Sequence, residues 1–216
     1  MARSDLLGRP SERSLIVADA GRVITGTAKG TRLMAPGIGT RPLGDRVKQA
    51  LFAALEGDLA DVGPTPFLDL YAGSGAAGVE ALSRGSPLAV FVERDVGAAR
   101  TIAENLRRTA LSGGTVVRRD VLAWLRDPEA KPGSCFGAVF IDPPYDQHQA
   151  LLDALAALGA APSRWLADGA VVVAKHFWRY EPAERIGGLS LMRRRRFGET
   201  ALSYYRHYTI MEVDHR

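Results

Sequence analysis

The strongest candidate for chemistry is the stretch AVFIDPPYDQ, residues 138–147, where Asp142, Pro143, Pro144 and Tyr145 follow an apolar run. Each proline fixes φ and lacks a backbone N–H, so the pair can continue neither a sheet nor a helix. We therefore expect a buried strand to end in a stiff corner that holds the acid and the ring just beyond its carboxyl end. The simpler alternative is a loop that only terminates the strand, and the upstream residues decide between the two.

Such a corner suits methyl transfer to the exocyclic amine of a nucleobase. That nitrogen is a poor nucleophile because its lone pair is delocalised into the ring, so it must pyramidalise and point at the methyl donor. Asp142 and a backbone carbonyl of the proline pair can accept hydrogen bonds from the amine, and the carboxylate stabilises the positive charge that develops there. Tyr145 can stack on the base, which must be unpaired or flipped out to reach the corner.

A glycine-rich turn upstream predicts a cofactor site. In LDLYAGSGAAGVEAL, Gly73, Gly75 and Gly78 form G-x-G-x-x-G between an expected strand and helix, where glycine lets the backbone approach a ligand. The pattern alone is weak, but Glu93 ends the next strand, where it can accept both ribose hydroxyls. Asp120 ends the third strand, within reach of an adenine amino group. The alternatives are a packing glycine, a surface glutamate and a helix-capping aspartate.

Two cofactors fit such a crevice, a dinucleotide or S-adenosylmethionine. Asp69 precedes the glycines and suits the ammonium of the methionine end, whereas it would repel a pyrophosphate. The corner around Asp142 has no evident use in hydride transfer. We therefore expect S-adenosylmethionine, with a nicotinamide dehydrogenase as an alternative.

The elements that must position these residues alternate along the chain from residue 66. Apolar runs at 66–72, 88–93, 115–120, 136–142 and 169–175 predict strands, and helical patterns at 76–85, 95–111 and 148–159 stand between them, with a short helix through Trp124. Repeated strand–helix units with continuous apolar strands predict a parallel sheet covered on both faces. Residues 22–36 predict a small hairpin, 44–57 an amphipathic helix, and 189–212 an antiparallel hairpin at the sheet edge.

Composition limits the other possibilities. The 216 residues suffice for one α/β domain with a small appendage. Because Cys135 is the single cysteine, an internal disulfide is excluded, and no cluster of side chains suggests a metal. The N-terminus lacks the apolar core of a signal peptide, and no run approaches the ~20 apolar residues of a membrane span. We expect a cytoplasmic protein without a membrane partner.

Positive charge is concentrated before the α/β pattern. Residues 1–50 hold nine Lys/Arg and four Asp/Glu, although the whole chain carries only +4. This suits an arm that faces a polyanion. A solvated basic terminus without a partner is an equally good interpretation.

The sequence resembles the RsmD family of bacterial 16S rRNA guanine-N2 methyltransferases. The matching pieces are RVITGTAKGTRLMAP, TRPLGDRVKQALF, LDLYAGSGAAGVEALSRG, VFVERD, VFIDPPY and FGETALSYY, in the family's order over residues 22–210. The resemblance implies a Rossmann-like class I methyltransferase fold: a seven-stranded, mostly parallel sheet with an antiparallel C-terminal hairpin, plus an N-terminal β-hairpin and helix. It divides the chain into a flexible extension (1–20), an RNA- and cofactor-facing unit (21–60) and the methyltransferase domain (61–216).

The resemblance also implies roles for individual residues. The cofactor S-adenosylmethionine would contact Asp69, Tyr71, Gly73, Ser74, Gly75 and Gly78 at its methionine end, Glu93 and Arg94 at the ribose, and Asp120 and Val121 at the adenine. Asp142, Pro143, Pro144 and Tyr145 would form the catalytic corner, and Arg41, Pro42, Asp45, Arg46 and Lys48 would contact RNA at its mouth. The chain departs from the family at Leu43, where threonine is usual, and in AKHFWRY, residues 174–180.

The expected partner is 16S rRNA, free or within an assembling 30S subunit, and we expect a monomer. Arg193 to Arg196 form a run in which alternate side chains of a strand face opposite sides, so about two of them could follow a phosphate track. A charged edge strand is an equally good interpretation. Two other functions stay open: a DNA or other RNA amino-methyltransferase with the same pocket, and a catalytically idle RNA-binding protein.

Overall fold

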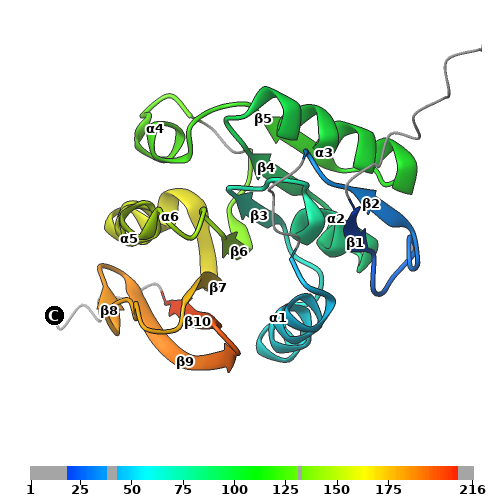
Figure 1. Ribbon diagram of the computed structural model, residues 1–216. Coiled ribbons are helices and arrows are strands. Elements are labelled where there is room, and N and C mark those ends of the chain that lie inside the picture. Colours follow the sequence, from blue (N-terminus) through cyan, green and yellow to red (C-terminus); the bar gives the residue numbers. More distant parts are fainter. Residues whose placement is uncertain (1–18, 38–42, 131–132, 209–216) are drawn as a thin grey trace, which may run out of the picture.

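The computed structural model describes residues 19–37, 43–130 and 133–208, and it centres on one eight-stranded sheet (Figure 1). The strand order is β5-β4-β3-β6-β7-β10-β9-β8, in which β5 to β7 are parallel and the last three strands are antiparallel to their neighbours. The strands are β3 (Phe67–Leu70), β4 (Ala89–Val92), β5 (Gly114–Val117), β6 (Phe136–Ile141), β7 (Leu166–Phe177), β8 (Arg185–Ile186), β9 (Leu189–Phe197) and β10 (Thr200–His207). The predicted parallel sheet and C-terminal hairpin are confirmed, with one strand more than expected because the two-residue β8 pairs with β9.

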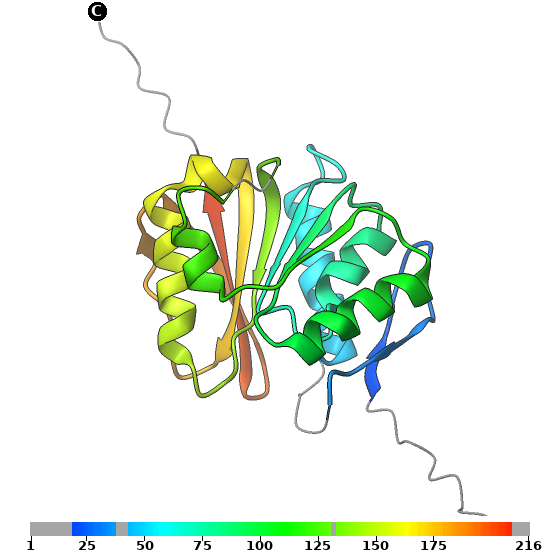
Figure 2. The same cartoon turned by 90° about the horizontal axis from the view of Figure 1, so that it is seen from above.

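Helices cover both faces of the sheet, which is why its central strands are apolar without alternation. One face carries α1 (Asp45–Asp58), α2 (Ala76–Ser83) and α3 (Val96–Thr109), and the other carries α4 (Val121–Arg126), α5 (His148–Ala160) and α6 (Pro162–Trp165) (Figure 2). No helix in the described part of the chain is long and apolar enough to cross a membrane.

The strand order reverses between β3 and β6, which makes their carboxyl ends the place where a ligand is expected in an open α/β sheet. Leu68 and Leu70 of β3 face the α4–α6 side of the core, whereas Asp69 lies between them and faces the other side. The same alternation places Phe140 of β6 and Val173 of β7 on the face of Asp69. This parity determines which polar residues meet beyond the strand ends.

The N-terminal hairpin, β1 (Asp19–Arg22) and β2 (Arg32–Met34), is attached to the C-terminal end of α2. The buried carboxylate of Glu80 accepts hydrogen bonds from the backbone N–H groups of Ile24 and Thr25, at 2.7 and 3.0 Å. The Ser83 hydroxyl accepts from Ala28 N at 3.0 Å and donates to Thr25 O at 2.6 Å. A Cβ at Gly26 would collide with the Ser83 carbonyl, so only glycine fits this close approach.

These contacts join two stretches that are far apart in the sequence: RVITGTAKG in the hairpin, and the LSRG at the C-terminal end of α2. The hairpin and α1 also contribute to the same apolar cluster as α2, so they pack as part of the main core. The predicted boundary after residue 20 falls inside β1, and the predicted flexible extension lies, up to residue 18, outside the described residues.

Candidate active site

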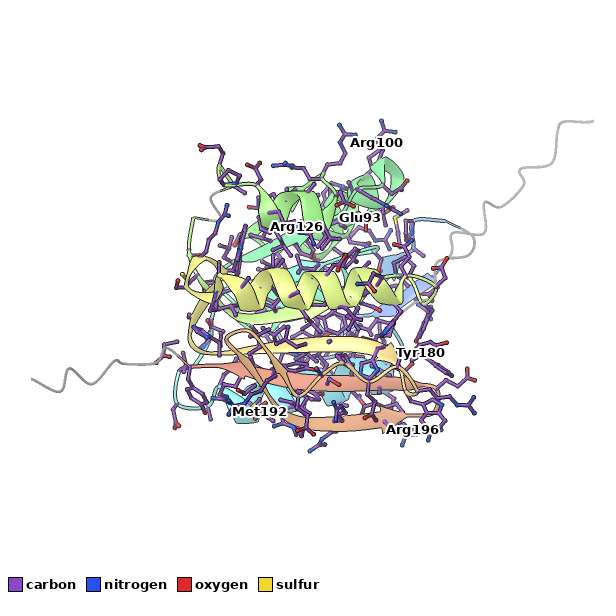
Figure 3. All side chains as sticks on the ribbon, turned by 90° about the vertical axis from the view of Figure 1, so that its left-hand side faces the viewer. Glu93, Arg100, Arg126, Tyr180, Met192 and Arg196 are labelled. Atoms are coloured by element: carbon purple, nitrogen blue, oxygen red, sulfur yellow. The ribbon has the colours of Figure 1, made fainter. Side chains whose placement is uncertain are left out.

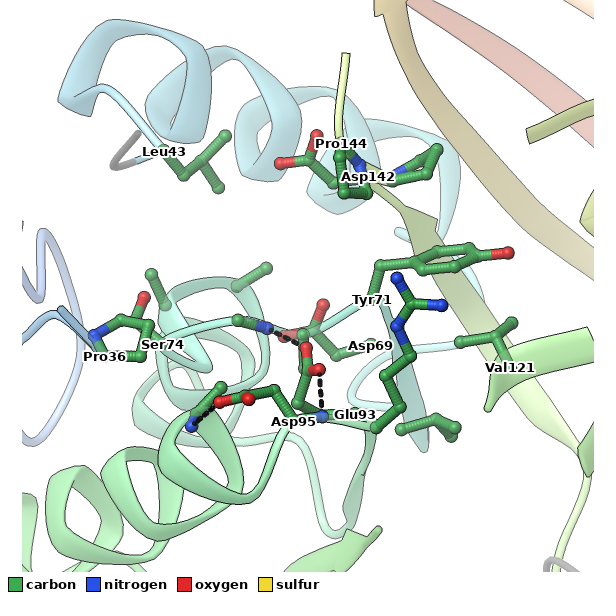
Figure 4. Close-up of a pocket in the computed structure, with 18 of the residues that line it drawn as sticks. Pro36, Leu43, Asp69, Tyr71, Ser74, Glu93, Asp95, Val121, Asp142 and Pro144 are labelled. Carbon is green, nitrogen blue, oxygen red and sulfur yellow. Dashed lines mark hydrogen bonds between the residues drawn. The ribbon is translucent and has the colours of Figure 1, made fainter. Parts of the chain in front are cut away.

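A cleft of about 640 Å³ opens beyond the carboxyl ends of β3, β4 and β6 (Figure 4). This size falls in the range of small-molecule sites. Among the predicted residues, those that line it are Asp69, Tyr71, Gly73, Ser74, Glu93, Arg94, Asp120, Val121, Asp142, Pro143, Pro144 and Tyr145. The structure therefore brings the predicted cofactor residues and the predicted catalytic corner to one cavity.

The turn between β3 and α2 owes its shape to left-handed backbone. Tyr71, Gly73 and Gly75 have φ values of 61°, 56° and 75°, and Gly75 is the N-cap of α2. Gly78 has another role, because a Cβ there would overlap the ring of Phe91, which is fully buried on β4. Gly75 and Gly78 do not line the cleft, so their contribution is to shape the turn and to let α2 pack against the sheet.

Asp69 stabilises this turn by a hydrogen bond to the first turn of α2. Its side chain is buried, with 2% of the residue exposed, and Oδ2 accepts a hydrogen bond from Gly78 N at 2.9 Å. Burial raises the pKa of Asp69 well above its usual value, the Gly78 N–H opposes the rise, and the carboxyls of Asp142 and Glu93 add to it. Asp69 also lines the cleft, where a cationic ligand group would hold its carboxyl ionised.

Glu93 joins the glycine turn to the start of α3. Its Oε2 accepts from Gly73 N at 2.9 Å, and its Oε1 accepts from Asp95 N at 2.8 Å. Asp95 in turn caps α3 by accepting from Ala98 N at 2.8 Å (Figure 4). The Glu93 carboxylate is therefore held at the strand end by backbone donors, with lone pairs left for hydroxyl groups of a ligand.

Asp120 caps a helix and also lines the cleft. Its Oδ1 caps α4 by accepting from Ala123 N at 3.0 Å, while Oδ2 lies 3.9 Å from Nη1 of Arg94 in the cleft wall.

The Tyr71 hydroxyl donates to Ala150 O at 3.3 Å, and burial raises the pKa of Tyr71 to about 12. Tyr71 therefore contributes a neutral ring to the wall.

The acid of the corner has a charged partner that the sequence analysis did not identify. Lys175 Nζ lies 2.6 Å from Oδ1 and 2.9 Å from Oδ2 of Asp142, and 4.8 Å from the centre of the Tyr145 ring. Lys175 is buried and lines the cleft. Burial raises the pKa of Asp142, and the lysine opposes that rise by its charge and its hydrogen bonds.

Strand register explains this pair. Ile141 of β6 is opposite Ala174 of β7, so the next residue of each strand, Asp142 and Lys175, comes side by side on one face. The signal was present in the sequence as a lysine at the end of the fifth apolar run, but only the register connects it with the corner. The neighbouring His176 faces the other side, where its Nε2 lies 2.8 Å from Ser203 Oγ, so it is packed in the interior and does not line the main cleft.

The predicted RNA contacts have mixed outcomes. Arg41 and Pro42 lie outside the described residues. Leu43 is buried and lines the cleft, Asp45 lies 3.4 Å from Arg22 in the first turn of α1, and Arg46 is exposed beside it.

The prediction for Lys48 is wrong. Its side chain is fully buried, its Nζ donates to Arg22 O at 2.5 Å, and it lies 3.9 Å from Oε2 of Glu80. Burial lowers the pKa of Lys48, and Glu80 opposes the change. A side chain enclosed in this way cannot contact RNA, and instead it helps to hold the hairpin in place.

Among the described residues, no three His, Cys, Asp or Glu side chains gather as a metal site would require.

Comparisons with known proteins identify the family of this chain. The family model described as Conserved hypothetical protein 95 matches residues 21–206. YlbH from Bacillus subtilis is 37% identical over 186 residues, which are 86% of this chain and 98% of YlbH. Ribosomal RNA small subunit methyltransferase D from Escherichia coli is 34% identical over 152 residues, covering 70% of this chain and 72% of that protein.

A solved structure leads to the same conclusion. The structure of yhhF from Escherichia coli has a TM-score of 0.74 at 28% identity, and the match covers 88% of this chain and 99% of yhhF. The chain therefore belongs to the RsmD family of methyltransferases, and it has the class I methyltransferase fold that its sequence predicted.

Proposed function

We propose that this protein transfers a methyl group from S-adenosylmethionine to the N2 amine of a guanine in 16S rRNA. The proposal rests on one observation: the glycine turn and the Asp142–Tyr145 corner line the same cleft. The 16S substrate follows from the relative named ribosomal RNA small subunit methyltransferase D and from the family resemblance. A cytoplasmic monomer is the form in which we expect it to act.

The residues of the cleft fit S-adenosylmethionine, which supplies a methyl group bound to a sulfonium. One oxygen of Asp69 is occupied by Gly78 N–H, which leaves the other for the ammonium of the methionine end. Glu93 would accept the ribose hydroxyls, and Asp120 with Val121 would hold the adenine. Buried carboxyls suit a cationic ligand and disfavour a pyrophosphate, because like charges repel strongly in a poorly solvated site.

At the corner, Asp142 would accept hydrogen bonds from the amine and Tyr145 would stack on the base. An ionised carboxylate offers about four lone-pair positions, so the two contacts from Lys175 leave capacity for the amine. Lys175 favours the ionised state of Asp142 that can accept such bonds. Most of the rate would come from orienting the amine toward the methyl group rather than from a strong base.

RNA would enter over the first turn of α1. Arg46 is exposed there and Leu43 forms part of the cleft wall. We therefore assign the RNA contact to this region, and we keep Arg41, Pro42 and Asp45 in it as the sequence predicts. Charge reversal at Arg41 and Arg46 should weaken RNA binding and reduce its dependence on salt. An unchanged salt slope would remove these residues from the contact.

The direct test is transfer of tritiated methyl groups to deproteinised rRNA and to partly assembled small subunits, followed by nucleoside mass spectrometry. We expect N2-methylguanosine from the wild type and none from Asp142→Asn, which keeps the size of the side chain but not its charge. Methylated adenine or cytosine amines would contradict the base assignment. Cofactor binding without transfer to any nucleic acid would indicate an idle RNA-binding protein.

A further inference from the structure

The segment that follows β7 carries a group of aromatic rings at the surface. Tyr180 is 52% exposed, and its ring centre lies 4.9 Å from that of His148 and 5.5 Å from that of Phe177. Because about half of this ring is in water, its packing contributes little to the stability of the fold beyond the contacts with His148 and Phe177. The exposed part of Tyr180 is therefore available to a ligand.

Two guanidinium groups lie over the next ring. The Cζ atoms of Arg196 and Arg179 are 3.7 and 5.0 Å from the centre of the Trp178 ring. Arg196 is also held by a hydrogen bond from Nε to Gly198 O at 2.7 Å, and Trp178 N donates to Glu199 O at 3.0 Å. These contacts order two positive charges beside an aromatic surface.

This group adjoins the corner of the cleft. A narrow hollow beside the corner is lined by Tyr145 and Lys175 together with His148, Phe177 and Tyr180. The Tyr145 hydroxyl lies 2.8 Å from Thr200 Oγ1, which ties the corner to the β9–β10 turn. Figure 3 shows Tyr180 and Arg196 at the end of the sheet toward which β7 points, the same end as the cleft.

The charge of this surface suits a polyanion. Arg194 already contacts Pro182 O at 2.6 Å and lies 3.5 Å from Glu181, so this pair is nearly neutral. Arg179 and Arg196 lie over Trp178 and supply the positive charge of this surface, while the acids Glu199 and Asp146 stand in the β9–β10 turn and after the corner. Arg193, on the opposite face of β9, binds Asp58 at 2.5 and 2.9 Å.

We propose that this surface, called here the aromatic strip, binds the nucleotides of single-stranded RNA that flank the target base. It consists of His148, Phe177, Trp178, Tyr180, Arg179 and Arg196, and the proposal rests on the function proposed above. Bases stack on exposed rings and on guanidinium planes without regard to sequence, while arginine neutralises phosphate. The strip would hold the strand next to the corner, where Tyr145 receives the target base.

The test measures binding of a fluorescent single-stranded RNA of mixed sequence by anisotropy at several salt concentrations, with a duplex of equal length for comparison. Tyr180→Ala should weaken single-strand binding about tenfold, whereas Tyr180→Phe, which keeps the ring, should bind as the wild type does. Arg196→Ala should also lower the slope of log K against log salt by about 0.7, the value for one phosphate contact in a single strand.

Arg195→Ala is the matched control, because Arg195 is an exposed arginine on the same strand whose side chain faces the other side. Equal effects of Arg195→Ala and Arg196→Ala would overturn the proposal, as would wild-type binding by Tyr180→Ala. Equal weakening of duplex binding by Tyr180→Ala would also overturn it, because the bases of a duplex are not free to stack on the ring. If the wild type transfers no methyl group while Tyr180 and Arg196 still govern binding, the strip stands and the proposed function fails.

Discussion

Lys175 and Asp142 form a charge pair in the wall of the cleft, with the ammonium 2.6 and 2.9 Å from the two carboxylate oxygens. The same ammonium lies over the ring of Tyr145. One buried lysine therefore contacts both side chains to which we assign the chemistry. It sets the charge of the acid and limits the positions of the ring.

Replacement of this lysine should change the pH dependence of methyl transfer. Burial raises the pKa of Asp142 and Lys175 opposes the rise, so Lys175→Met should raise that pKa further. Because the ionised carboxylate is the form that accepts hydrogen bonds from the amine, the acid limb of the kcat/KM profile should move to higher pH. Initial rates with saturating S-adenosylmethionine across a pH series measure the shift.

Lys175→Arg is the control for this prediction, because it keeps a positive charge beside Asp142, and its acid limb should stay close to that of the wild type. Removing one partner of a buried ion pair also costs about 3 kcal/mol of stability, so urea unfolding must show that both variants are folded in the assay. An acid limb that stays in place, or moves to lower pH, in Lys175→Met would contradict the role of the lysine.

Glu93→Gln should weaken binding of S-adenosylmethionine roughly ten- to hundredfold, because hydrogen bonds to a charged acceptor contribute about 1.5–3 kcal/mol. The substitution also replaces one of the two oxygens that accept from Gly73 N and Asp95 N. Isothermal titration calorimetry with S-adenosylmethionine measures the loss. A matched titration with methionine alone should show a smaller loss, because it reports only the effect on the turn at Gly73. An equal loss for methionine and for S-adenosylmethionine would place Glu93 away from the ribose.

Much of the fold was predictable because its signals are local. Continuous apolar strands between helical patterns indicated the parallel sheet, and the glycines indicated the turn that precedes α2. The two-residue β8 escaped prediction because so short a strand leaves no periodic pattern. The sequence also did not show which residues of β6 and β7 lie opposite each other, since register depends on how two strands meet.

The lining of the cleft was predictable where a residue's place in or just after a strand decides it, as for Asp69, Glu93 and Asp120. The prediction failed where the position of a side chain depends on a tertiary partner. In the sequence, Lys48 resembles an exposed lysine. In the structure it is buried beside Glu80, which lies 32 positions later in the chain. Lys175 was overlooked for the same reason, because its partner Asp142 stands on a neighbouring strand.

Gly78→Ala should destabilise the fold by about 1–3 kcal/mol through overpacking, although alanine favours helices by up to ~1 kcal/mol over glycine. The added methyl group would overlap the Phe91 ring, which is fully buried and cannot move into solvent. Phe91→Leu should relieve the overlap, so the double variant should lose less stability than the sum of the two single variants. Urea denaturation of all four proteins measures the coupling, and strict additivity would contradict the steric explanation.

Glu80→Ala should destabilise the protein by about 3–5 kcal/mol, because it leaves a buried lysine without its opposite charge and two backbone N–H groups without their acceptor. The amides of Ile24 and Thr25 should then exchange hydrogen faster. Arg84 pairs with Glu80 and also with Glu56, which is at the surface. Glu56→Ala is therefore the matched control, because a surface pair contributes ~0–1 kcal/mol.

The pH dependence of the Glu80→Ala deficit follows from Lys48. Burial lowers the pKa of Lys48 and Glu80 opposes this, so in the variant the folded lysine releases its proton more readily than the unfolded one. The cost of burying the charge is then present at neutral pH and diminishes as the pH rises through that lowered pKa, because the neutral amine is easier to bury. Denaturation at neutral and alkaline pH measures this change. Equal deficits at both pH values would show that the charge of Lys48 does not contribute. A deficit no larger than that of Glu56→Ala would show that the hairpin is held by apolar packing alone.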